Sequence, residues 1–224
     1  METSADLFSL EERLSVPISQ IAHPDDIQIF GTHWGNDTYY GDYCGIAAKY
    51  GPRRILEIGV RYGYSGIALC DGALRSGFTV PRVNYTGIDA ECFGAAEPGG
   101  DAYRLYRSNA IAAENFKRFF EPDAVQARFF TLDTQKEALP PAVTSSAYDL
   151  VNIDGHHSYD GALKDMENTW PLLREGGLVL VDDMGMEEVA RAVFHFVQQV
   201  TEPVQCQLHP NERMLMIIRK GMHG

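Results

Sequence analysis

The chain has little positive charge. Among its 224 residues, 19 Lys and Arg are set against 31 Asp and Glu, and the formal net charge is -12. A nucleic acid would meet repulsion rather than counterion release, so we expect no nucleic acid partner. The chain also lacks an apolar run long enough to span a membrane, and its first residues lack the basic and apolar stretches of a signal peptide. We therefore expect no membrane partner and a cytoplasmic location.

Cysteine is scarce as well. The four residues are scattered and form no CxxC pair: Cys44, Cys70, Cys92 and Cys206. This spacing is typical of free thiols in a reducing compartment and disfavours a soft-metal site. A composition of 45% hydrophobic and 22% charged residues is ordinary for a globular domain. We expect one domain over residues 1–224, with a helical or lid segment over 1–50 and the core over 51–224.

Strand-like apolar runs alternate with helical patterns beyond the helix stop at Gly51-Pro52. Strands are predicted at 54–60, 83–91, 127–135, 148–155 and 176–184. Helices are predicted at 64–77 (with Ser65 as candidate N-cap), 102–120, 162–173 and 187–200. Residues 204–220 are predicted to form two strands around a turn at 209–212. The alternation predicts an α/β fold, a doubly wound and mostly parallel sheet of about seven strands with an antiparallel pair at its end.

Acidic residues stand at the end of every candidate parallel strand. They are Glu57, Asp89, Asp133, Asp154 and the pair Asp182-Asp183. A single acid of this kind is usually a solvated surface residue. In a doubly wound sheet, however, ligands bind at the carboxyl ends of the strands, so the alignment of these acids on one edge indicates a binding site.

A glycine-rich turn follows the first strand in ILEIGVRYGYSG, residues 55–66. A dinucleotide site needs G-x-G-x-x-G, but here Arg61 stands where the second glycine would be and the spacing is Gly59-x-x-x-Gly63. Glu57 would also repel a pyrophosphate, whereas it suits a cationic or amine-bearing ligand. A tight turn without a ligand is the alternative.

A second group of residues lies in VNIDGHHSYDG, residues 151–161, and in the later LVDD. Asp154, Asp182 and Asp183 end adjacent strands, and crowded carboxylates repel unless a cation is present. Oxygen-rich clusters suit hard cations such as Mg²⁺, Mn²⁺ or Ca²⁺. The alternatives are an acidic helix cap and, for His156 and His157, a polar loop that packs or hydrogen-bonds.

The motifs in this order resemble class I S-adenosylmethionine (SAM)-dependent methyltransferases, whose sheet is Rossmann-like. The likeness is greatest to metal-dependent O-methyltransferases that act on macrolide sugars and related natural products. It implies SAM as cofactor, with the glycines against its methionine part, the first acid at its amino group, one aspartate at the ribose and another at the adenine. The cofactor-binding residues it implies are Glu57, Gly59, Gly63, Ser65, Asp89, Asp133 and Asp154.

The resemblance also assigns the metal and the base. It implies that Asp154, Asp182 and Asp183 bind a divalent cation, Mg²⁺ first and Mn²⁺ or Ca²⁺ otherwise. His157 stands at the position of the catalytic base, and His156 is the second candidate. A cation would lower the pKa of the acceptor hydroxyl, and a neutral histidine would take its proton before attack on the SAM methyl group.

The front segment GTHWGNDTYYGDY, residues 31–43, departs from that family. Gly31-Thr32 match its pattern, but His33-Trp34 replace an Asp-Lys pair. Its aromatic and imidazole side chains could form a lid over cofactor or acceptor, or pack in the core or a subunit interface; they are His33, Trp34, Tyr39 and Tyr40. The resemblance further implies a hydroxylated small-molecule acceptor and a homo-oligomer, a dimer or higher.

The sequence is compatible with three other functions. A metal-independent SAM enzyme, such as an N-methyltransferase or a cyclase, would use the same fold, because folds do not determine chemistry. A SAM-binding protein without catalysis would bind the cofactor and turn nothing over. A nicotinamide-dependent oxidoreductase is disfavoured by the missing G-x-G-x-x-G.

Overall fold

The computed structural model describes residues 37–78, 82–93, 103–104, 108–210 and 214–221. The helical piece predicted over the first thirty residues lies outside these ranges. No helix in the described part of the chain is both long and apolar enough to cross a membrane.

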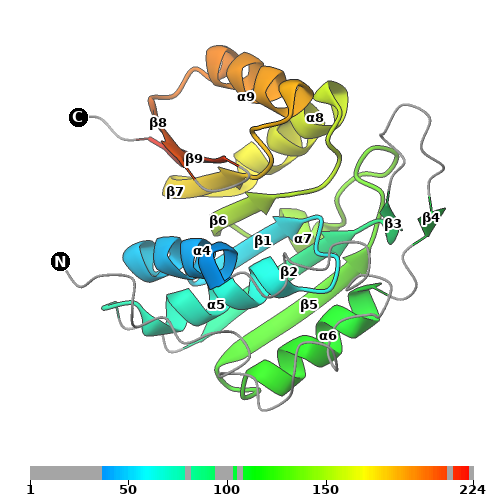
Figure 1. Ribbon diagram of the computed structural model, residues 1–224, viewed down its shortest axis with the longest axis vertical. Coiled ribbons are helices and arrows are strands. Elements are labelled where there is room, and N and C mark those ends of the chain that lie inside the picture. Colours follow the sequence, from blue (N-terminus) through cyan, green and yellow to red (C-terminus); the bar gives the residue numbers. More distant parts are fainter. Residues whose placement is uncertain (1–36, 79–81, 94–102, 105–107, 211–213, 222–224) are drawn as a thin grey trace.

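A seven-stranded sheet forms the centre of the molecule, in the order β5-β2-β1-β6-β7-β9-β8 (Figure 1). Its strands are β1 (Arg54–Ile58), β2 (Val83–Asp89), β5 (Val125–Thr131), β6 (Tyr148–Ile153), β7 (Leu173–Val181), β8 (Val204–His209) and β9 (Leu215–Lys220). The first five run parallel, and β9 lies antiparallel between β7 and β8. This confirms the predicted doubly wound sheet with its antiparallel end.

Helices cover both faces of the sheet (Figure 1). One face packs against α4 (Asp37–Tyr50), α5 (Tyr64–Arg75) and α6 (Ser108–Phe119). The other packs against α8 (Tyr159–Thr169), the 3-10 turn η2 (Trp170–Leu172) and α9 (Glu187–Gln199), with the short α7 (Pro141–Thr144) nearby. Alternating residues of β1 enter the two cores, Ile55 on the first face and Leu56 on the second. A strand buried on both faces has no polar side, which explains the continuous apolar runs in the sequence.

Two local predictions are wrong. The N-cap of α5 is Gly63 in a left-handed conformation, while Ser65 points its hydroxyl into the core. The helix predicted from residue 102 begins at Ser108, because Tyr103–Arg104 forms the short strand β4 against β3 (Cys92–Phe93). A helical apolar pattern cannot reveal such a pairing with a distant segment.

The carboxyl ends of the parallel strands are held in register by the backbone. The amide of Gly59 donates to the Ile88 carbonyl at 2.8 Å, and the amide of Asp154 donates to the Ile58 carbonyl at 2.9 Å. β1 lies between β2 and β6, so the order of strands along the chain reverses there. This reversal is where doubly wound sheets open a ligand crevice.

The antiparallel strand β9 supports the end of β7. Val181 pairs with Met216, and just beyond them the amide of Met184 donates to the Met214 carbonyl at 3.2 Å. The acidic loop Asp182-Asp183 is therefore held from one side by β6, through the Asp182 amide and the Ile153 carbonyl at 3.0 Å, and from the other by the β9 end.

Candidate active site

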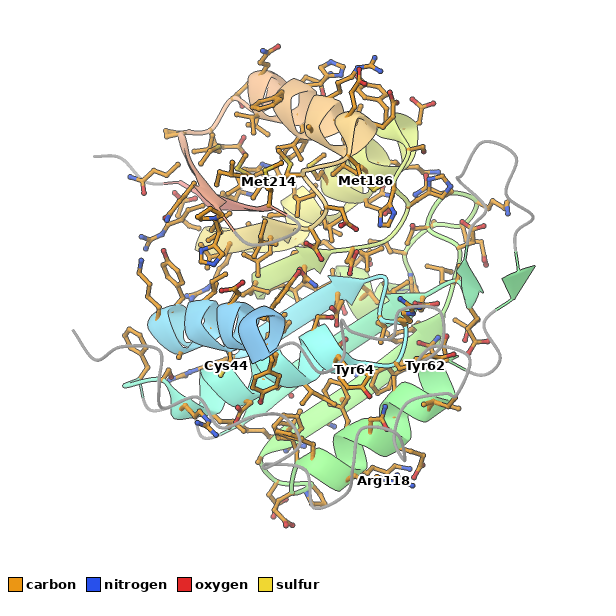
Figure 2. The ribbon with its side chains drawn as sticks, in the orientation of Figure 1. Cys44, Tyr62, Tyr64, Arg118, Met186 and Met214 are labelled. Atoms are coloured by element: carbon orange, nitrogen blue, oxygen red, sulfur yellow. The ribbon has the colours of Figure 1, made fainter. Side chains whose placement is uncertain are left out.

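The glycine-rich turn after β1 passes close to the end of β6. Gly59 has a φ of 87°, and a Cβ placed on it would lie 1.9 Å from the carbonyl oxygen of Asp154. Gly63 has a φ of 88°, and its Cβ would lie 3.1 Å from the Phe116 ring. Tyr62 and Tyr64, which flank Gly63, lie at the start of α5 on the side of α6 (Figure 2). Close packing against backbone requires Gly59, and the left-handed φ favours glycine at Gly63, so these two positions of the turn carry no side chain.

Glu57 lies beneath this turn and is fully buried. Its carboxylate accepts hydrogen bonds from Ser65 Oγ at 2.5 Å, from Asn152 Nδ2 at 2.7 Å and from the Tyr85 hydroxyl. Burial raises the pKa of Glu57 to about 7, against the lowering effect of these donors. The predicted cofactor residues Glu57 and Ser65 therefore form a polar network inside the core, and they brace the turn from below.

Asp89 ties the end of β2 to the same turn. Its Oδ2 accepts from the backbone amide of Arg61 at 2.7 Å and its Oδ1 from the amide of Glu91 at 2.6 Å. Burial raises the pKa of this carboxyl above its ordinary value. The carboxylate lies beside the turn at the carboxyl edge of the sheet, where the sequence predicts the ribose contact.

Asp133 follows β5 on the same edge and is more exposed. Its Oδ2 pairs with Lys136 Nζ at 2.7 Å, and its Oδ1 accepts from the Gln135 amide at 3.0 Å. The lysine lowers the pKa of Asp133, so its carboxylate is ionised at neutral pH.

Asp154, His157 and Asp183 come together at the ends of β6 and β7. His157 Nε2 lies 3.6 Å from Asp154 Oδ1 and 3.3 Å from Asp183 Oδ2, and one donor atom from each residue lies within 4.8 Å of the others. Asp183 has a φ of 57°, a left-handed conformation that is uncommon for a non-glycine residue. This group of three contains His157, which the sequence predicts as base, in addition to two of the three predicted metal ligands.

Asp182, the third predicted ligand, has a different position. It is 2% exposed, and its Oδ1 accepts from the backbone amide of Asp183 at 2.9 Å. This contact helps to hold Asp183 in its left-handed conformation. Asp182 is not part of the group that the structure brings within 4.8 Å.

The two neighbouring histidines occupy different environments. His156 Nδ1 lies 2.8 Å from Ser158 Oγ and 3.3 Å from the Ser158 amide, at the start of α8. A Cβ on Gly161 would come within 2.6 Å of the same nitrogen, so the His156 side chain packs closely against the first turn of the helix. Burial, together with the neighbouring His157, lowers the pKa of His156. His156 therefore braces the helix start, whereas His157 faces the two carboxylates.

The predicted lid is described only in part. His33, Trp34 and the side chain of Tyr39 lie outside the described residues. Tyr40 is 5% exposed and donates its hydroxyl to Asp71 on α5 at 2.6 Å. Tyr40 is thus a core residue between α4 and α5, the second of the two roles that the sequence allowed.

Sequence reasoning missed three polar residues that support the site. Tyr85 and Asn152 bind Glu57 from β2 and β6, and Asp165 lies buried on α8. Asn152 carries a visible signal, because an amide inside the apolar run LVNID needs a buried partner. Tyr85 and Asp165 have no such signal, since a tyrosine in a strand and an acid in a helix are ordinary in a sequence.

Residues 56–184, more than half of the chain, match a family described as a methyltransferase domain. The chain belongs to this family of SAM-dependent methyltransferases. A curated relative, the uncharacterized protein y4gI of Sinorhizobium fredii, is 29% identical over 187 residues. The match covers 82% of this chain but only 18% of that much longer protein.

Solved structures share the fold at low sequence identity. The O-methyltransferase TomG of Streptomyces achromogenes, involved in tomaymycin synthesis and solved with SAM, has a TM-score of 0.65 at 18% identity over 98% of this chain and 94% of that one. The O-methyltransferase of Bacillus cereus, solved with S-adenosylhomocysteine (SAH), has a TM-score of 0.56 at 17% identity, covering 95% of both chains. The SAH-bound methyltransferase PaMTH1 of Podospora anserina has a TM-score of 0.58 at 16% identity over 97% of this chain and 91% of that one.

Proposed function

We propose that this chain transfers the methyl group of SAM to a hydroxyl of a small molecule, with a divalent cation at the acidic group. The observation that carries the proposal is the meeting of Asp154, His157 and Asp183 at the carboxyl edge of the sheet, beside the Gly59 turn. The family supplies the cofactor class. The O-methyltransferases of similar fold support oxygen as the methyl acceptor.

The residues around the turn fit SAM. Gly59 and Gly63 present backbone without side chains, so the methionine part of the cofactor has room to lie against it. Asp89 accepts from the Arg61 amide on Oδ2 and from the Glu91 amide and the Ser108 hydroxyl on Oδ1, and its carboxylate would accept a ribose hydroxyl as well. Asp133 offers its ionised carboxylate to the adenine amino group. Glu57 acts from beneath, holding the turn rather than the ligand.

The acidic group fits a hard cation. Asp154 and Asp183 offer carboxylate oxygens, the ligands that Mg²⁺ or Mn²⁺ prefers, within 4.8 Å of one another, and they would hold the cation, with Asp182 bracing the loop and His157 beside it as base. A bound cation supplies Lewis acidity, which lowers the pKa of an acceptor hydroxyl.

His157 is the base in this proposal. Its Nε2 lies 3.3 Å from Asp183 Oδ2 and 3.6 Å from Asp154 Oδ1, so an acceptor hydroxyl bound at a cation on these carboxylates would lie near the ring. A neutral imidazole accepts the hydroxyl proton at Nε2, and the carboxylates stabilise the imidazolium that results. The deprotonated acceptor oxygen would then form a bond to the methyl carbon of SAM as the methyl–sulfur bond breaks, and SAH would leave.

The same geometry favours one alternative. An imidazolium at 3.3–3.6 Å from two carboxylates would neutralise much of their repulsion without a cation. In that case the chain would be a metal-independent SAM enzyme. Turnover that survives a chelator distinguishes this alternative.

Calorimetric titration tests the proposal. We expect SAH to bind the chelator-treated protein, and Mn²⁺ to bind the SAH complex with a stoichiometry of about one. Asp154→Asn should weaken Mn²⁺ binding by roughly tenfold or more, and by a larger factor than it weakens SAH binding. His195→Ala, a histidine on α9 outside the group, is the matched control. Absence of a cation site in the wild type would overturn the metal mechanism, and absence of SAH binding would overturn the function.

The acceptor is proposed as a hydroxylated natural product or its sugar, on the resemblance alone. A single domain, a homo-oligomer and a cytoplasmic location are proposed with it. Light scattering at several concentrations measures the assembly. A panel of sugar, phenol and amine acceptors, assayed by SAH release, tests the substrate class.

A further inference from the structure

Asp165 is a buried acid that the reaction proposed above does not use. It lies on α8 with 1% of its surface exposed, inside the molecule rather than at the crevice. Burial raises its pKa to about 6, against the lowering effects of the Thr134 hydroxyl, Lys164 and the His156 backbone. A buried carboxyl is costly, so its presence calls for a structural reason.

On one side, Asp165 holds the loop that follows β5. Its Oδ1 accepts from Gln135 Nε2 at 3.2 Å, and the same amide nitrogen lies 3.4 Å from the Gly161 carbonyl. Lys164, the neighbour of Asp165 on α8, donates its Nζ to the Gln135 carbonyl at 2.6 Å. Gln135 lies two residues from Asp133, the proposed adenine contact. This side of α8 therefore sets the position of the proposed adenine loop.

On the other side, Asp165 touches the loop that follows β6. Its Oδ2 lies 3.0 Å from the position of a Cβ on Gly155, so it rests against the backbone between Asp154 and His156. The backbone amide of His156 faces this carboxylate and lowers its pKa. The buried oxygen thus lies beneath the loop that carries His157.

We propose that Asp165 is a positioning residue that couples the loop at Thr134-Gln135 to the loop at Gly155–His157. One carboxylate bridges the two loops from below, so an ordered adenine loop and an ordered base loop favour one another. The roles of the two loops, adenine contact and base, rest on the proposed function. The contacts of Asp165 with both loops do not depend on it. An apolar side chain at this position would fill the space and leave the loops unconnected.

Hydrogen exchange of the free protein tests the bridge. Asp165→Ala should accelerate amide exchange in both loops, and Asp165→Asn, which keeps an oxygen for Gln135, should restore much of the protection. Gln135→Ala should accelerate exchange at 155–157, although it does not touch that loop. Glu167→Ala, an exposed acid on the same helix, is the control. Faster exchange confined to one loop, or spread evenly over α8, would overturn the inference.

Binding measurements separate this inference from the function on which it rests. We expect Asp165→Ala to weaken SAH binding about tenfold and to reduce the factor by which Mn²⁺ changes SAH affinity. Asp165→Asn should be close to the wild type in both measurements. A lower melting temperature with unchanged SAH affinity and unchanged Mn²⁺ coupling would overturn the positioning role. If the wild type binds no SAH while both loops still respond in hydrogen exchange, the proposed function fails and the bridge stands. Should the alanine variant not fold, the asparagine and Gln135→Ala variants carry the test.

Discussion

Individual residues in the site differ sharply even when they are adjacent in the chain. His156 packs on α8 and contacts Ser158, whereas His157 faces Asp154 and Asp183. Asp182 is buried and Asp183 reaches the group with His157. In both pairs one residue supports the loop and its neighbour belongs to the group of Asp154, His157 and Asp183.

This difference predicts opposite results for the two histidines. His157→Ala should lower turnover by roughly a hundred- to ten-thousandfold, the range of a lost general base, with SAH affinity within about twofold. His156→Ala should chiefly lower the melting temperature, because the start of α8 loses its packing. Steady-state kinetics, SAH titration and thermal unfolding measure the three quantities. Full turnover in His157→Ala would remove this residue from the role of base.

The close packing of helix α4 against helix α5 cannot be read from the sequence. α4 and α5 pack so closely that a Cβ on Gly72 would lie 2.0 Å from the Cys44 carbonyl oxygen. Gly45, on α4, has open space around it. Helix packing therefore requires a glycine at position 72 but not at position 45.

Alanine substitutions at these two glycines should change the free energy of unfolding in opposite directions. Gly72→Ala must push the helices apart, which we expect to cost about 1–3 kcal/mol or more of unfolding free energy. Gly45→Ala should gain up to about 1 kcal/mol from helix propensity. Urea denaturation of both variants measures the difference. A neutral Gly72→Ala would mean that the helices separate without cost.

At the scale of the whole molecule, the order of strands and helices was predictable from the sequence, but many side-chain contacts were not. The alternating apolar runs predict the parallel sheet and place Asp89, Asp154 and Asp183 on one edge. Hydrophobic periodicity reports burial, and burial on both faces defines a parallel strand. Periodicity does not report that the Ser65 hydroxyl turns inward to Glu57, because that contact depends on how α5 packs against β1. It also gave no reason to separate Asp182 from Asp183.

The stability of the molecule should depend on pH through Glu57. Its pKa rises from 4.5 to about 7 on folding, so the unfolded chain loses this proton first. The stabilisation is complete below about pH 4.5 and is lost as pH rises through 7, by at most roughly 3 kcal/mol. Asp165, raised from 3.8 to about 6, acts in the same direction.

Glu57→Gln should flatten this pH profile. Its uncharged amide resembles the protonated acid, so the fall in melting temperature between pH 5 and pH 8 should be several degrees smaller than in the wild type. Differential scanning calorimetry at a series of pH values measures the melting temperature of both proteins. Glu167→Gln, at an exposed position, should follow the wild-type curve; parallel profiles for wild type and Glu57→Gln would contradict the assignment.

The position of β9 has a consequence for the order in which the protein is made. Val181, the residue before the acidic loop, pairs with Met216, and the Met184 amide rests on Met214. A ribosome must therefore translate more than thirty further residues before Asp182 and Asp183 acquire their neighbouring strand. The glycine turn and the ends of β1, β2 and β6 emerge much earlier. A nascent chain would accordingly assemble its cofactor crevice before its acidic loop is braced.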